Sequence, residues 1–287
     1  MRPEGHEDLG TVALENMQVA EPGETRMAEP AKAMEAVAAD DDEARAPILT
    51  FMSGKGGAGK TISLMTIVSA LSARGKKVAI LEADEMRPIT AWRADGLEKG
   101  TWDEEILIYT IEDADDLGVA LRKADEAGAD FVFIDTKGGG SDLNQTIILN
   151  SQLVIVPTAL DINEMKALFR TCNYLVDAIE GYEDEVSVQI LLNRTPTRDS
   201  ALAATNKVGL KALIDAEMPV MTSRLPRRQV FSDLPQGGIL HKYFEYCRKH
   251  PDRRVMAPEV RKAIKDADTL TDEVLSLLEP EAKEAQA

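Results

Sequence analysis

A glycine-rich loop with two lysines offers the clearest chemistry in this sequence. Residues 53–61 read SGKGGAGKT, so that Gly54 to Thr61 match the pattern G-x-x-x-x-G-K-[ST], between an apolar run and a helical pattern. Glycines in such a loop let backbone N–H groups point inward at phosphate oxygens, at the start of a helix. We expect Lys60 to reach the β- and γ-phosphates of a nucleotide and the Thr61 hydroxyl to bind Mg²⁺. The residues expected to surround the nucleotide here are Gly56, Gly57, Ala58, Gly59, Lys60, Thr61 and Ile62.

Two acidic residues follow predicted buried strands and supply the second part of the chemistry. Asp135 ends the run FVFID, where its carboxylate can hold Mg²⁺ or the water around it. Asp84 follows the strand that ends at Glu82 and is expected to orient an attacking water. An alternative for Asp84 is that it caps the helix after Pro88. The glycines at 138–140 predict a loop that moves with the γ-phosphate.

Short apolar strands alternate with helical patterns over most of the chain. Alternation of this kind predicts an α/β fold with one doubly wound, mostly parallel sheet and helices on both faces. Gly75 is expected to end the helix that follows the loop, and Asp161 with Glu164 has the spacing of a capping box at the start of a long helix. The predicted strands cover residues 47–52, 78–82, 106–111, 131–135, 153–158 and 186–193.

The two ends of the chain differ from the part between them. Residues 1–46 hold twelve acidic and four basic side chains and no aromatic residue, which predicts a disordered acidic extension. An alternative is a short helix over residues 27–39 that docks on a partner. Residues 47–280 are expected to form one domain, and residues 281–287 an acidic tail.

Composition excludes several classes of protein. The sequence has no run of 18 apolar residues and no apolar signal segment, so we expect a cytoplasmic protein without membrane insertion. Cys172 and Cys247 lack metal-ligand spacing and are expected to be buried or idle thiols. Trp92 and Trp102 are expected to be packing residues.

The KGG-x-GKT form of the loop resembles the deviant Walker A motif of the ParA/MinD family of P-loop ATPases. In that family two subunits sandwich two ATP molecules, and the residue matching Lys55 crosses to the nucleotide of the other subunit, as an arginine finger does elsewhere. The resemblance implies a homodimer on MgATP and slow, partner-stimulated hydrolysis. It also implies that Lys55, Lys60 and Asp84 are catalytic, that Asp135 is the Walker B aspartate, and that Asn193 contacts adenine. Pro226 is expected to border the same pocket.

Three longer segments, LTFMSGKGGAGKT, EADEMRPITAWRADG and DTKGGGSDLNQTIILNS, resemble the VirC-type, overdrive-binding ATPases of T-DNA transfer. This resemblance implies action on a DNA or protein cargo, with placement on the nucleoid or at the cell pole. Ile62 departs from the family, which has a threonine there. Alternatives are a partition ATPase working with a centromere-binding protein, and a positioning factor for a non-DNA machine. The acidic C-terminal end speaks against the membrane-bound form of the latter.

A basic segment near the C-terminus contrasts with the net charge of −17. Residues 224–262 hold ten Lys or Arg and four Asp or Glu, and two copies in a dimer would contact the phosphates of nonspecific double-stranded DNA. The alternative is a solvated basic face with internal ion pairs. The predicted DNA-binding residues are Arg224, Arg227, Arg228, Lys242, Arg248, Lys249, Arg253 and Arg254.

Overall fold

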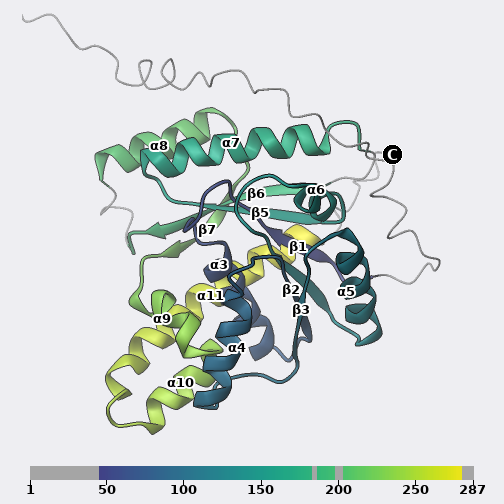
Figure 1. The fold of residues 1–287 in the computed structure, drawn as a ribbon. Helices are drawn as coiled ribbons and strands as arrows, with labels where there is room; N and C mark the ends of the chain where they lie inside the picture. Colours follow the sequence, from purple (N-terminus) through teal and green to yellow (C-terminus); the bar gives the residue numbers. More distant parts are fainter. Residues whose placement is uncertain (1–44, 183–185, 198–202, 280–287) are drawn as a thin grey trace, which may run out of the picture.

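The computed structural model describes residues 45–182, 186–197 and 203–279 (Figure 1). The predicted acidic tail at residues 281–287, and all but the last two residues of the predicted N-terminal extension, lie outside this described part. Both predictions about the ends of the chain therefore remain predictions.

A single seven-stranded sheet forms the centre of the fold, in the order β3-β2-β4-β1-β5-β6-β7. Every neighbouring pair of strands is parallel, which confirms the predicted doubly wound α/β fold. The strands are β1 (Ile48–Phe51), β2 (Val78–Glu82), β3 (Ile106–Thr110), β4 (Phe131–Asp135), β5 (Leu153–Thr158), β6 (Ser187–Thr195) and β7 (Val220–Pro226).

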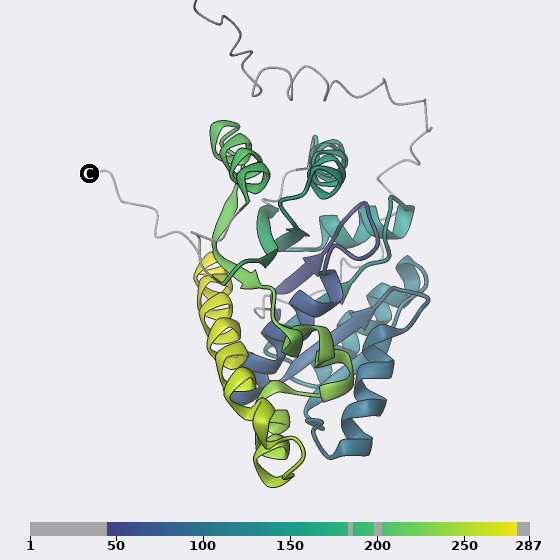
Figure 2. The ribbon, with the colours of Figure 1, turned by 90° about the vertical axis from the view of Figure 1, so that its left-hand side faces the viewer.

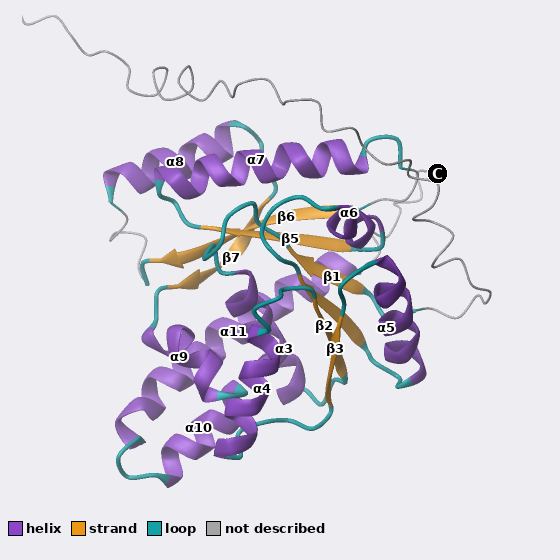
Figure 3. Cartoon of the chain, in the orientation of Figure 1, coloured by secondary structure: helices purple, strands orange, loops and turns teal. Residues whose placement is uncertain are grey.

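Helices cover both faces of the sheet because successive strand residues point to opposite faces (Figure 3). Leu49 and Ile80 face one core, with α3, α4 and α9–α11, whereas Ala79 and Val154 face the cores under α5–α8. The helices on the first face are α3 (Lys60–Ala73), α4 (Pro88–Lys99), α9 (Gln229–Gly237), α10 (Leu240–Lys249) and α11 (Ala257–Leu278). Those on the second are α5 (Ala114–Glu126), α6 (Asp142–Leu149), α7 (Ile162–Ile179) and α8 (Ala204–Asp215).

The strand order changes direction at β1, which places the glycine loop in the middle of the sheet edge. β4 and β5 flank β1, and the chain passes from β1 to α3 on the first face but from β4 and β5 to α6 and α7 on the second. Ligands of open α/β sheets bind at such a point, outside the carboxyl ends of the strands. Figure 2 shows α11 running along one side of the molecule, with α7 and α8 packed at one end.

Most sequence predictions about single elements are confirmed. Gly75 follows α3 with φ +71°, a conformation that suits glycine at a helix end. Trp92 and Trp102 are buried and pack edge to face at 4.9 Å, as expected of packing residues. Cys247 is buried and Cys172 is partly buried, and burial raises the pKa of the Cys172 thiol to about 11. Strand β7 and helices α9 and α10 were not predicted from the sequence.

Candidate active site

The loop after β1 needs glycine at its last position for two separate reasons. Gly59 has φ +106°, which residues with a side chain rarely adopt, and it directly precedes α3. A Cβ atom at this position would also lie 1.8 Å from Asn193 Nδ2. The Asn193 amide donates a hydrogen bond to the Ala58 carbonyl at 3.2 Å and so ties the loop to the end of β6.

Thr61 and Asp135 meet directly beneath this loop, as the predicted metal site requires. The Thr61 hydroxyl donates to Asp135 Oδ2 at 2.8 Å, and Asp135 is fully buried. Within the described part of the chain, Asp135 Oδ1 is buried without a hydrogen-bond partner. An orphaned carboxylate oxygen beside a hydroxyl, at a phosphate-binding loop, fits Mg²⁺, which takes oxygen ligands from one or two side chains and from phosphates.

Burial raises the pKa of Asp135 to about 7. The Thr61 hydrogen bond and the Lys60 charge oppose this rise, whereas the charges of Asp84 and Glu82 add to it. The carboxyl group is therefore poised between its two protonation states near neutral pH. A divalent cation would favour the ionised state.

Glu82, and not Asp84, caps the following helix. Its buried carboxylate accepts hydrogen bonds from the Ile89 N–H and from the Thr90 hydroxyl, each at 2.5 Å, at the start of α4. Asp84 Oδ1 instead accepts from the Met86 N–H at 2.9 Å within its own loop. The alternative that Asp84 caps this helix is thus wrong. Its expected role toward water remains a prediction.

The glycine segment after β4 packs directly on the phosphate-binding loop. A Cβ atom on Gly138 would lie 3.8 Å from the Gly56 nitrogen. Lys137 pairs with Glu85 at 3.4 Å and so connects this segment to the loop that carries Asp84. The loop expected to move with the γ-phosphate therefore contacts the glycine loop and is joined by an ion pair to the loop that carries Asp84.

A pocket of about 450 Å³ opens beside the glycine loop. Ile62, Asn193 and Pro226, which were predicted to contact a nucleotide, all line it. Gly57 and Gly59 of the loop line it too, and its other walls, which were not predicted to contact a nucleotide, come from the ends of β5, β6 and β7 and from α8 and α9. These are Ala159, Leu160, Asp161, Arg194, Thr195, Asn206, Arg227, Arg228, Phe231 and Ser232.

Lys55 is part of the glycine loop, and its amine forms an ion pair with a residue of α7. Its Nζ donates to Glu164 Oε1 at 2.9 Å, and an Arg194 nitrogen lies 3.4 Å from the same oxygen. Asp161 caps α7 as predicted, since its Oδ1 accepts from the Glu164 N–H at 3.1 Å. The Glu164 side chain, however, is engaged by Lys55 and Arg194 in place of the reciprocal capping bond. A separation of 109 residues hides the Lys55–Glu164 pair from sequence reasoning.

The eight predicted DNA-binding residues fall into two groups. Arg224, Arg227 and Arg228 lie at or just after the end of β7, beside the pocket, and the other five lie on α10 and in the turn after it. Arg228 is largely buried and ion-paired with Asp266 of α11 at 2.5 Å. Its position indicates a structural role between α9 and α11.

Ion pairs also occur in the second group. Lys242 Nζ lies 3.6 Å from Asp103 Oδ1, and Arg248 Nη1 lies 3.0 Å from Glu245 Oε1. Lys249, Arg253 and Arg254 are exposed at the end of α10 and in the turn before α11. The structure thus brings part of the expected basic face to a tip formed by these last three residues.

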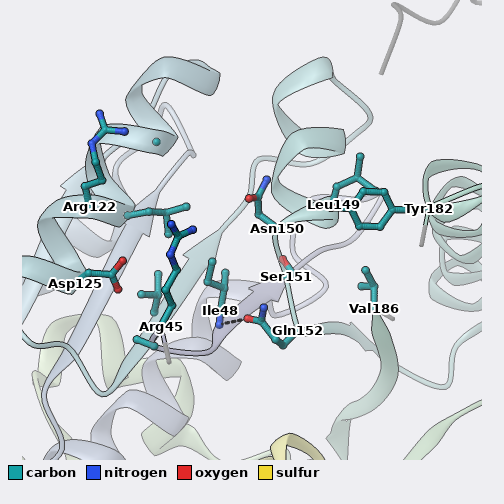
Figure 4. A pocket seen from close by; sticks show the side chains of 14 residues that line it. Arg45, Ile48, Arg122, Asp125, Leu149, Asn150, Ser151, Gln152, Tyr182 and Val186 are labelled. Carbon is teal, nitrogen blue, oxygen red and sulfur yellow. Dashed lines mark hydrogen bonds between the residues drawn. The ribbon is translucent and has the colours of Figure 1, made fainter. Parts of the chain in front are cut away.

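A second hollow of about 480 Å³ lies at the amino ends of the strands, across the sheet from the glycine loop (Figure 4). Ile48 at the start of β1 donates its N–H to Gln152 Oε1 at 2.7 Å there, and Arg122 and Asp125 approach from α5. None of the predicted site residues lines this hollow.

The sheet order, the glycine loop after β1 and the Thr61–Asp135 pair define a P-loop protein of the ParA/MinD class. Solved structures agree on the fold. One is a candidate plasmid partition protein from Borrelia burgdorferi bound to AMPPNP, with TM-score 0.56 and 17% identity over 81% of this chain and 99% of that one. Another is the MinD cell division protein of Aquifex aeolicus, with TM-score 0.54 and 16% identity over 79% of this chain and 97% of that one.

The sequence comparisons identify the family more narrowly. The family model described as VirC1 protein matches residues 46–280. Protein virC1 of Rhizobium rhizogenes and that of Rhizobium radiobacter are each 32% identical to the chain over 232 residues, which is 81% of this chain and 99% of the relative. The chain therefore belongs to the VirC1 family. The resemblance to VirC-type members of the ParA/MinD family is confirmed.

The structure has no helix long and apolar enough to cross a membrane within its described residues.

Proposed function

We propose that this chain is an ATPase that binds MgATP, forms a sandwich dimer on it, and acts on DNA or a DNA-bound cargo. The observation that supports this most is the convergence of two features on one loop. Thr61 and the partly unsatisfied Asp135 carboxylate lie below the loop, and the pocket lined by Asn193 lies beside it. The first feature suits Mg²⁺ and phosphates, and the second has room for a nucleoside.

Different side chains of the site would have different roles in phosphoryl transfer. Mg²⁺, when bound, neutralises charge on the phosphates, and Thr61 and Asp135 would hold it. The buried Lys60 amine would contact the β- and γ-phosphates. Asp84, in the loop after β2, would orient water toward the γ-phosphate. Lys55 would act on the nucleotide of the other subunit, which makes turnover depend on dimerisation.

We propose that the chain acts on a cargo of plasmid or T-DNA transfer, and its family supports this part of the proposal. Membership in the VirC1 family favours transfer of DNA, with a DNA-transfer protein as partner. A partition ATPase with a centromere-binding partner is the second candidate, since protein ParA of Rhizobium radiobacter is 23% identical over 197 residues. A pull-down with ATP-locked protein distinguishes the two by the partner recovered.

The first experiment tests whether the glycine loop binds MgATP, on which the rest of the proposal depends. Titration with a fluorescent ATP analogue should give saturable, Mg²⁺-dependent binding to the wild type. Lys60→Ala should lose this binding by two orders of magnitude or so, because the lysine neutralises phosphate charge. The matched control is Lys166→Ala on the exposed side of α7, which should bind as the wild type does. Retained binding by Lys60→Ala would rule out the phosphate-binding assignment.

A further inference from the structure

Glu164 is a buried carboxylate that serves two cations from different parts of the chain. Its side chain is 7% exposed, whereas those of Lys55 and Arg194 are 46% and 45% exposed. Lys55 comes from the glycine loop and Arg194 from the end of β6. The first turn of α7, where Glu164 lies, also favours a negative charge.

The glycine loop is docked on α7 through a second bond nearby. The Gly54 N–H donates to Thr171 Oγ1 at 2.8 Å, two turns along the same helix. Thr171 is buried and its hydroxyl donates in turn to the Ala167 carbonyl. The Lys55–Glu164 pair is therefore one of two contacts between the loop and α7, and the other one holds the loop backbone in place when the lysine side chain moves.

This geometry conflicts with the trans role of Lys55 in the proposed dimer. A lysine that reaches the nucleotide of another subunit has to leave Glu164. If Lys55 were the sole partner of Glu164, its departure would leave a buried, unpaired charge, which is strongly destabilising. Arg194 removes this difficulty, because it remains at 3.4 Å from the same carboxylate oxygen. We propose that Glu164 restrains Lys55 in the nucleotide-free subunit and that Arg194 neutralises Glu164 once Lys55 has left.

Arg194 is placed to link this restraint to the pocket. It has φ +54°, a left-handed conformation that is rare for residues with a side chain, where the pairing of β6 with β7 is irregular. Its N–H donates to Asn193 Oδ1 at 2.7 Å, and both residues line the nucleotide pocket. The restraint thus borders the space that a nucleotide would fill. This inference rests on the proposed function, which it deepens by adding two positioning residues.

Amine labelling tests the restraint without requiring a dimer. In nucleotide-free protein, an amine-reactive reagent followed by peptide mass spectrometry gives the labelling rate of Lys55. Glu164→Gln, which keeps the shape of the side chain, should raise this rate roughly threefold or more, because the lysine loses an ion pair. Asp177→Asn, an exposed carboxylate on the same helix, should leave it unchanged. An unchanged rate in Glu164→Gln overturns the inference.

Dimerisation tests the role of Arg194. The mass in solution is measured against the concentration of a nonhydrolysable ATP analogue with Mg²⁺. Glu164→Gln should lower the concentration for half-maximal dimerisation, and Arg194→Gln should raise it, each by roughly three- to tenfold. The double variant should behave like Glu164→Gln, since no buried charge remains. Arg170→Gln on α7 is the cation control.

Other outcomes separate this inference from the proposed function. If Glu164→Gln and Arg194→Gln shift dimerisation in the same direction, Glu164 does not oppose dimer formation and the inference is overturned. If Arg194→Gln does not fold, Arg194→Lys keeps the charge and should dimerise within twofold of the wild type or the inference fails. If the wild type binds nucleotide but stays monomeric while Glu164→Gln labels faster, the dimer proposal fails and the restraint stands.

Discussion

Asp135 is the residue whose environment differs most from that of an ordinary carboxylate. Because its pKa is raised to about 7 in the folded chain, the folded state holds a proton that the unfolded state releases near pH 4. Its contribution to stability is therefore fully present below pH 4 and is lost as the pH rises to about 7. The nucleotide-free protein should become less stable across this window.

Replacement of Asp135 by Asn should remove this loss. At pH 8, without Mg²⁺ or nucleotide, Asp135→Asn should be more stable than the wild type by on the order of 2–4 kcal/mol. The difference should vanish near pH 4. Urea unfolding at a series of pH values measures it, and parallel pH profiles for the two proteins would show that Asp135 titrates normally. The same variant should lose Mg²⁺-dependent nucleotide affinity.

We expect Asp84 to lower the reaction barrier and not to contribute to nucleotide binding. Asp84→Ala should therefore bind ATP and dimerise like the wild type, while its turnover falls roughly 100-fold or more. Phosphate release under saturating ATP measures turnover. Glu98→Ala, an exposed carboxylate on α4, is the control and should retain turnover. Normal turnover by Asp84→Ala would place the water-orienting group elsewhere.

At the scale of elements, α4 depends on a residue outside the helix. Arg87 precedes α4 with φ +52° and has no capping side chain, so Glu82 from β2 provides the cap. Glu82→Ala should cost about 2–4 kcal/mol, since it leaves buried helix N–H groups without an acceptor. Urea unfolding measures this. A loss of less than about 0.5 kcal/mol in the free energy of unfolding would mean that water or another group replaces the carboxylate.

The strands that carry the site were predictable because their signals are local. Each is a short apolar run bounded by turn residues, and Asp135 follows directly from such a run. Strand β7 was missed because its burial alternates irregularly, and α9 because it contains Pro235 and ends in two glycines. The sheet order itself depends on long-range pairing, which no local pattern encodes.

Contacts between side chains that are distant in the sequence are the part of the site that could not be predicted. Gly59 was predicted from its motif, but its contact with Asn193 joins positions that are 134 residues apart in the sequence. Glu164 matched a local capping pattern, and only the fold brings Lys55 to it. Positions in a motif were therefore predictable, and the side chains that restrain them were not.

At the scale of the whole molecule, DNA binding should depend on the tip at the end of α10. Glu substitution at Lys249, Arg253 and Arg254 should reduce affinity for duplex DNA at least tenfold, while ATP-driven dimerisation persists. Because the contacts would be to phosphates, each one lost should reduce the salt dependence of binding, by about 0.9 in the logarithmic slope. Gel shifts over a salt series measure both quantities.

The control for the tip is on the other face of the sheet. Arg122→Glu with Lys123→Glu on α5 changes the net charge in the same direction and should leave most of the affinity intact. Arg228 is unsuitable as a test, since its pair with Asp266 joins α9 to α11. Equal losses in the tip and α5 variants would indicate a general charge effect and no local interface.

The mass of the protein in solution shows whether ATP drives two chains into a dimer and whether this depends on Lys55. One chain has a mass of 31.3 kDa. With Mg²⁺ and ADP, light scattering after size exclusion should give this mass, and with a nonhydrolysable ATP analogue it should give twice as much. Lys55→Ala should bind the analogue and remain a monomer. A wild type that stays monomeric with the analogue would rule out the ATP-driven dimer, and a Lys55→Ala variant that dimerises as readily as the wild type would rule out the role of Lys55 across the interface.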